Sequence, residues 1–171
     1  MNPKRLDWFE RNLVFGHRAE MLPFFLERLE GTICRIESKV KGVSDKVLSE
    51  KYNGKWSVKQ NIGHLLEVDE VSVKRINEML NGVDVLSPAV FEPKDYNPFP
   101  IETLTSMFKK QRQTNLLLYR CLNESDLLKS STHPRLKTKM TPVDLAWFDA
   151  EHDDHHLLKI TDIINFNVLK S

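Results

Sequence analysis

The sequence predicts an all-α fold, a four-helix bundle with a long crossover loop between its second and third helices. Apolar residues recur at helical spacing in four separate stretches. Only 6 of the 171 residues are glycine, which is typical of a helix-rich chain. Four prolines within residues 83–100 block a regular helix and indicate the crossover. Because a chain of this length has the size of one domain, we expect residues 1–171 to form a single domain.

The first helix is expected to follow a short amphipathic segment, residues 3–15. It should begin at Pro23, because proline is tolerated in the first helical turn, and it should end near Gly42. Its apolar positions recur at helical spacing: Phe24, Phe25, Leu29, Ile33, Ile36 and Val40.

The second helix should begin after Ser57, because Gln60 stands in the reciprocal position of a capping box, and it should end near Leu80. It carries two apolar faces and therefore should contact two neighbours, as a bundle helix can. The smaller face lies beside His64 and consists of Val68 and Val71. His64 should point into the bundle or its mouth, where a lone histidine is more often a hydrogen-bonded core residue than a ligand.

The third helix should span about residues 101–122, and a polar, basic loop should follow at residues 127–139. Thr141 and Pro142 form a strong helix start, with Asp144 near the positive end of the helix dipole. The fourth helix is expected to run from there to about Asn165.

Two histidines of the fourth helix, His152 and His156, are spaced to project from one face on successive turns. Such a pair can supply two ligands of a metal ion, and a third histidine would leave open positions for water or substrate. His155 should lie on the outer face or behind the ligands. Pairs at this spacing also occur on ordinary helix surfaces and as hydrogen-bonded core residues, so the residues alone leave both interpretations open. His17 and His133 are weaker candidates.

The charge balance excludes some classes of partner. With 25 basic and 24 acidic residues interspersed, the chain has no basic stripe for nucleic acid and no polybasic anchor for lipid. The sequence contains no apolar run approaching the ~18 residues of a membrane span and no secretory signal, so we expect a cytoplasmic protein with no membrane partner. Cys34 and Cys121 should be reduced, buried thiols.

Two motifs carry a resemblance to a known family. The stretches WSVKQNIGHL, residues 56–65, and EHDDHHLLKI, residues 151–160, resemble the motifs of the DinB-like (YfiT-type) superfamily of metal-dependent enzymes. The resemblance implies a left-handed up-down-down-up bundle, commonly a homodimer, that binds a divalent metal ion, most often zinc or nickel. Its metal ligands fall on His64, His152 and His156. Gln60 stands at a position where relatives often have glutamate, and we expect this difference to have little consequence for metal binding.

Three neutral imidazoles would leave a divalent cation its full charge, so that it can lower the pKa of a coordinated water or thiol. The resemblance therefore implies a thiol-dependent S-transferase of the bacillithiol type, acting in detoxification on a small-molecule electrophile with a low-molecular-weight thiol. Metal-dependent hydrolysis is the alternative. The acidic residues near the histidines are expected to be solvated, and none receives a catalytic role: Glu67, Asp149, Glu151 and Asp153.

A further alternative is a non-catalytic helical module for protein interaction or dimerisation. Four aromatic residues could form its interface, or could instead belong to the core or line a pocket. They come from the N-terminal segment of residues 3–15, the lead-in, and from the crossover: Trp8, Phe91, Tyr96 and Phe99. A role in DNA repair has no support, because the charge balance offers no phosphate-binding surface.

Overall fold

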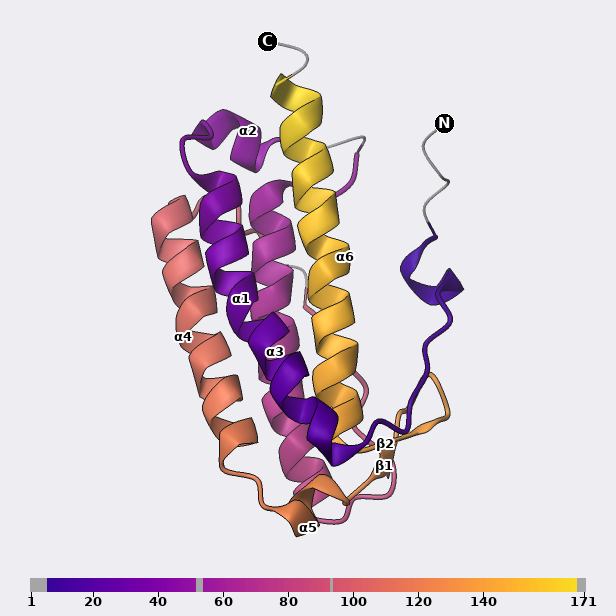
Figure 1. Ribbon diagram of the computed structural model, residues 1–171. Coiled ribbons are helices and arrows are strands. Elements are labelled where there is room, and N and C mark those ends of the chain that lie inside the picture. The colour runs from indigo at the N-terminus through magenta and orange to yellow at the C-terminus, as the bar shows by residue number, and fades with distance from the viewer. Residues whose placement is uncertain (1–5, 52–53, 93, 169–171) are drawn as a thin grey trace.

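Four long helices form the bundle in the computed structural model, which describes residues 6–51, 54–92 and 94–168 (Figure 1). They are α1 (Leu22–Val40), α3 (Val58–Leu80), α4 (Ile101–Arg120) and α6 (Pro142–Val168). Helix α1 runs up in the view of Figure 1, α3 and α4 run down, and α6 runs up again. Both α1 and α3 pack against α4 and α6. The all-α fold and the up-down-down-up order are therefore confirmed.

The boundaries of the two site-bearing helices follow the predicted capping. The Oγ of Ser57 accepts a hydrogen bond from the backbone N of Gln60 at 3.0 Å, and the Gln60 side chain accepts one from the backbone N of Ser57 at 3.0 Å. At the start of α6, Thr141 Oγ1 accepts from the N of Asp144 at 3.2 Å, and Asp144 Oδ2 accepts from the N of Thr141 at 3.0 Å. Each helix start thus satisfies two otherwise unpaired backbone donors.

Several short elements were not predicted. The chain forms two 3-10 turns, η1 (Trp8–Glu10) and η2 (Ala19–Met21), and two short helices, α2 (Asp45–Ser49) and α5 (Glu124–Leu127). Strands β1 (Ser131–Thr132) and β2 (Lys139–Met140) pair antiparallel within the segment expected to be a plain loop. Strands of two residues are too short to show an alternating apolar pattern, so they could not be predicted from the sequence.

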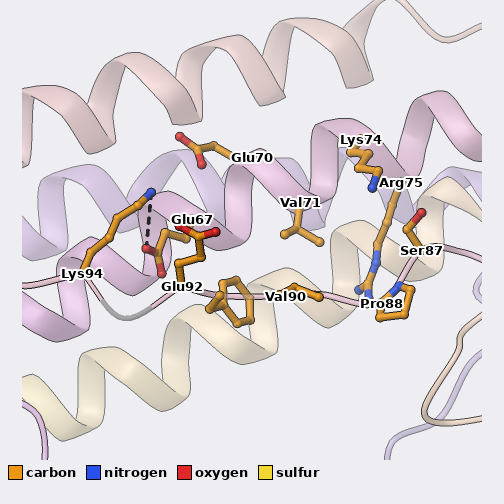
Figure 2. Close-up of a pocket in the computed structure, with 11 residues that line it drawn as sticks. Glu67, Glu70, Val71, Lys74, Arg75, Ser87, Pro88, Val90, Glu92 and Lys94 are labelled. Atoms are coloured by element: carbon orange, nitrogen blue, oxygen red, sulfur yellow. Dashed lines mark ion pairs between the residues drawn. The ribbon is translucent and has the colours of Figure 1, made fainter.

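Residues 81–100 form the predicted crossover. Because α3 and α4 run in the same direction, this connection has to return along the length of the bundle. Leu86 and Tyr96 are buried, and the N of Leu86 donates to the carbonyl of Thr132 at 3.0 Å. The Lys94 Nζ lies 3.7 Å from an Oε1 of Glu67 on α3 (Figure 2). The first contact joins the crossover to β1, and the second joins it to α3.

The core has an apolar cluster toward each end of the bundle and a belt of buried polar residues between them. One cluster includes Leu29, Ile76, Leu116 and Ala150, and the other includes Ile33, Leu65, Phe108 and Leu157. The belt draws on all four long helices and consists of Thr32, Asp69, Ser72, Arg112, Asn115, Asp149 and Asp153.

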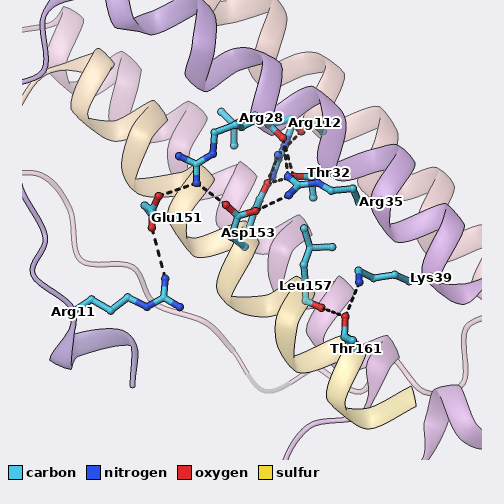
Figure 3. Close-up of polar contacts among 12 residues, drawn as sticks. Arg11, Arg28, Thr32, Arg35, Lys39, Arg112, Glu151, Asp153, Leu157 and Thr161 are labelled. Carbon is cyan, nitrogen blue, oxygen red and sulfur yellow. Dashed lines mark hydrogen bonds and ion pairs between the residues drawn. The ribbon is translucent and has the colours of Figure 1, made fainter. Parts of the chain in front are cut away.

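Arg112 is the centre of this belt. Its Nε donates to Asp69 at 2.7 Å. Its two terminal nitrogens donate to the two carboxylate oxygens of Asp153 at 2.5 and 3.0 Å (Figure 3). It also donates to the carbonyl of Leu29 at 2.9 Å, and Thr32 donates to Asp153 at 2.7 Å. One guanidinium therefore joins α1, α3 and α6 to α4.

Two expectations about burial were wrong. Glu67, Asp149 and Asp153 are buried, because each has a hydrogen-bond donor that replaces water; Glu151 is half-buried and lies between Arg28 and Arg11. Cys34 and Cys121 are free thiols, as expected, but both are exposed. Helices of the described residues fall short of the length and apolar character needed to cross a membrane.

Candidate metal centre

Three histidines converge between α3 and α6. His64 comes from α3, and His152 and His156 come from successive turns of α6. One ring nitrogen from each lies within 4.8 Å of the other two. The ring centroids are 5.2 Å apart for His64 and His152, 4.9 Å for His64 and His156, and 4.5 Å for His152 and His156. The structure thus brings together the three residues that the resemblance implied, in a group that could hold a metal ion. We call His64, His152 and His156 the triad.

Asn61 orients one of these rings. Its Nδ2 donates to the carbonyl of Ser57 at 2.7 Å, so its Oδ1 is directed at the Nδ1 of His156, 2.7 Å away. An amide oxygen can only accept, and Nδ1 of His156 must therefore carry the proton while Nε2 keeps its lone pair. The sequence analysis did not identify Asn61. Its position one turn before His64 on α3 was the available signal.

The other two rings lack comparable partners. Nδ1 of His152 is buried and has no hydrogen-bond partner among the described residues. Nδ1 of His64 lies 3.9 Å from an oxygen of Glu67, which is too long for a hydrogen bond. Buried polar groups usually have a partner, so the orphaned nitrogen of His152 fits a site that binds a cation better than a closed core cluster.

The three rings are held in the neutral form. Burial lowers the pKa of His64 to about 4, with a smaller contribution from the charge of Lys159. Burial also lowers the pKa of His152 and of His156 well below the usual value. The second cause is the charge of a neighbouring ring, that of His64 for His152 and that of His152 for His156. Neutral imidazoles have a free lone pair at pH 7, which is the form that binds metal ions.

Aromatic residues from outside the four helices cover the triad. The ring of Trp56 lies 4.8 Å from that of His64, and Phe91 of the crossover lies 4.7 Å from the same ring. Trp8 of the lead-in lies 5.1 Å from His152 and 5.7 Å from His155. His155 is half-buried beside Trp8 and does not belong to the group of three histidines that could hold a metal ion.

A close approach between α3 and the crossover lies beside His64. The hydroxyl of Tyr96 donates to Glu67 at 2.9 Å, and the Tyr96 ring rests on the helix at Gly63. A Cβ at Gly63 would lie 2.1 Å from Cδ2 of Tyr96. Only glycine leaves room for this ring, which places the crossover next to the triad.

A cavity of about 490 Å³ extends from the triad. Two histidines of the group, His64 and His152, line it, and Arg75 and His133 line it as well. The wall between them is largely apolar and includes Trp8, Val68, Val71, Pro88, Phe91 and Phe148. The two valines confirm that the second apolar face of α3 borders the site.

The aromatic residues considered for an interface mostly serve the core and the cavity. Trp8 and Tyr96 are buried, and Trp8 and Phe91 line the cavity. Phe99 is 38% exposed. His17 lies away from the triad, with its ring 4.8 Å from that of Trp147.

Comparisons with known proteins agree with this architecture. The sequence model of the DinB superfamily matches residues 17–160. Among solved structures, YfiT from Bacillus subtilis is similar, with 19% sequence identity, a TM-score of 0.78, and coverage of 90% of this chain and 91% of that chain. YfiT is described as a probable metal-dependent hydrolase with an unusual four-helix bundle topology. No curated protein matches the sequence.

Proposed function

This chain belongs to the DinB superfamily, and from that premise we propose that it is a metal-dependent enzyme in which His64, His152 and His156 bind a divalent cation. The observation that carries the proposal is the convergence of three neutral imidazoles, with nitrogen atoms within 4.8 Å of one another, at the wall of a cavity large enough for a small molecule. A structural metal site would be closed, whereas three protein ligands leave positions open.

A divalent cation in this site would supply Lewis acidity, lowering the pKa of a water or thiol and polarising an electrophile. The chain's own residues provide the remainder of the site. Asn61 fixes the tautomer of His156, and the rings of Trp8, Trp56 and Phe91 limit the access of water. A small molecule bound in the cavity would lie beside His64 and His152, which line it.

For the reaction we propose transfer of a low-molecular-weight thiol, of the bacillithiol type, to a small-molecule electrophile, with zinc or nickel as the metal. Its support is the resemblance of residues 56–65 and 151–160 to a superfamily with such transferases. The apolar wall of the cavity suits the carbon skeleton of an electrophile. Metal-dependent hydrolysis is the second candidate, favoured by the description of the structurally similar YfiT.

Metal content tests the ligand assignment. Elemental analysis of untagged protein should find near-stoichiometric zinc or nickel in the wild type and its loss in His64→Ala and His152→Ala. The matched control is His155→Ala, a neighbouring histidine of α6 outside the ligand group, which should keep its metal. A wild type that stays empty after zinc, nickel or manganese is added back would overturn the proposal.

Turnover separates the two reactions. Metal-loaded wild type should consume a model electrophile only when a thiol is added, and His64→Ala should not. Hydrolysis of an activated ester without thiol would instead identify a hydrolase. Metal binding with neither activity would favour the interaction module, in which the metal is structural.

A further inference from the structure

The cavity also has charged and polar residues in its lining: Arg75, His133, Arg135 and Asp149. Arg75 lies three turns after His64 on α3, a rise of about 16 Å along the helix, and its side chain extends toward Pro88 of the crossover (Figure 2). Arg75 and His133 line the same cavity as His64 and His152. The cavity therefore joins the proposed metal site to a second group of hydrogen-bond donors.

Arg75 has unused hydrogen-bonding capacity. The residue is 6% exposed, and its Nε is buried without a hydrogen-bond partner among the described residues. The acids near it are bonded elsewhere: Asp149 accepts from Ser72 at 2.5 Å, and Glu78 accepts from the N of Ser87 at 2.9 Å. Arginine stays protonated in proteins, so a buried positive charge faces this cavity with a donor to spare.

His133 adds a second donor. Its Nδ1 accepts hydrogen bonds from the backbone N of Arg135 at 3.2 Å and of Leu136 at 3.1 Å. The proton of the neutral ring must then be on Nε2. Burial, together with the nearby charges of Arg75 and Arg135, lowers the pKa of His133 to about 4, so the ring is neutral at pH 7 and Nε2 is a donor. The hairpin of β1 and β2 holds this ring in place.

We propose that Arg75 and His133 bind the carboxylate of an amphipathic substrate whose apolar part lies along the cavity wall. A single negative charge fits better than a phosphate dianion, because Glu78 and the ionised fraction of Asp149 already offset part of the charge of Arg75. The part of the proposal that places the reactive end of this substrate at the triad rests on the proposed function. The binding of the carboxylate does not.

Titration calorimetry on chelator-stripped protein tests the carboxylate site without a metal. The probes are 4-phenylbutyrate and its neutral amide, which differ only in charge. Wild type should bind the acid about tenfold to a hundredfold tighter than the amide, the range for hydrogen bonds to a charged group. Arg75→Gln and His133→Gln should each reduce this preference at least severalfold, while the amide affinity, which reports on an intact cavity, stays the same.

The matched control is Arg120→Gln, which removes an arginine paired with Glu30 on the surface and should keep the full preference. Equal binding of acid and amide by the wild type, or a preference that survives both Arg75→Gln and His133→Gln, would overturn the proposal. Tighter binding of 3-phenylpropyl phosphate than of the carboxylate would overturn the choice of anion. Because these measurements use metal-free protein, their failure is distinguishable from failure of the metal assignment.

Discussion

Replacing Gly63 with alanine should destabilise the protein, although the same change in an open helix is stabilising. Gly63 lies inside α3, one residue before His64, and the ring of Tyr96 covers it. An added Cβ would lie 2.1 to 2.4 Å from three ring carbons of Tyr96, including Cγ at the root of the ring. The whole ring would have to move, and with it the hydrogen bond to Glu67 beside the triad.

The magnitude follows from two opposing terms. Alanine is favoured over glycine in a helix interior by about 1 kcal/mol. Overpacking a filled site costs typically about 1–3 kcal/mol, and a displaced Tyr96 would also lose part of the ~2 kcal/mol from burying its ring. The net result is a loss of about 2 kcal/mol in the free energy of unfolding, or a Tm lower by ~4–8 °C for a chain of this size.

Gly31→Ala is the matched control. Gly31 lies inside α1, and a Cβ there would meet nothing within 4 Å. Only the helix term remains, so its Tm should rise by about 2–4 °C. Both variants can be compared with the wild type by thermal unfolding followed by circular dichroism.

Removing the Tyr96 ring should reverse the sign of the effect of Gly63→Ala on stability. In a Tyr96→Ala background the obstacle at Gly63 is gone, and Gly63→Ala should then be neutral or stabilising. If Gly63→Ala proved as stable as the wild type in the presence of Tyr96, the close approach of the crossover to α3 would be refuted.

Two further predictions concern Asn61 and Asp149. Asn61→Ala leaves Nδ1 of His156 without its acceptor and should weaken metal binding about 10- to 100-fold in chelator competition. Asn77→Ala, which removes an exposed amide of the same helix, should leave the metal affinity unchanged. Equal metal affinities of the two variants would refute the positioning role of Asn61. Burial raises the pKa of Asp149 to about 7, above its unfolded value of 3.8, so its contribution to stability is present below pH 3.8 and is lost as the pH rises to 7. Between pH 5 and 8 the metal-free wild type should therefore lose about 3 kcal/mol relative to Asp149→Asn in denaturant titrations, and a constant difference would contradict the raised pKa.

Local rules predicted much of the fold. The capping residues Ser57 and Thr141 marked helix starts correctly, because a cap depends only on residues within one turn. The prolines of residues 83–100 predicted the crossover for the same reason. The pairing of His64 with His152 and His156 came from the family resemblance, since periodicity places a ring on a helix face but does not say which faces meet.

What could not be predicted depends on distant partners. Asp149 and Asp153 resemble solvated acids in the sequence, and they are buried because Ser72 and Arg112 supply donors from other helices. Arg75 and His133 are far apart in the sequence and line the same cavity only in the folded chain. The hairpin that positions His133 has strands of two residues, which are too short to show an alternating apolar pattern. A single sequence contains no signal for such pairs.

The buried belt also bears on the geometry of the proposed metal centre. The core-facing stripe of α6 carries Asp153 between His152 and His156, and Arg112 binds both carboxylate oxygens of Asp153. A two-point contact fixes the rotation of the helix, whereas apolar packing alone tolerates small rotations. Buried ion pairs add little net stability compared with apolar residues of the same size. We therefore infer that Arg112 and Asp153 act chiefly on orientation, holding α6 so that its two histidines face His64.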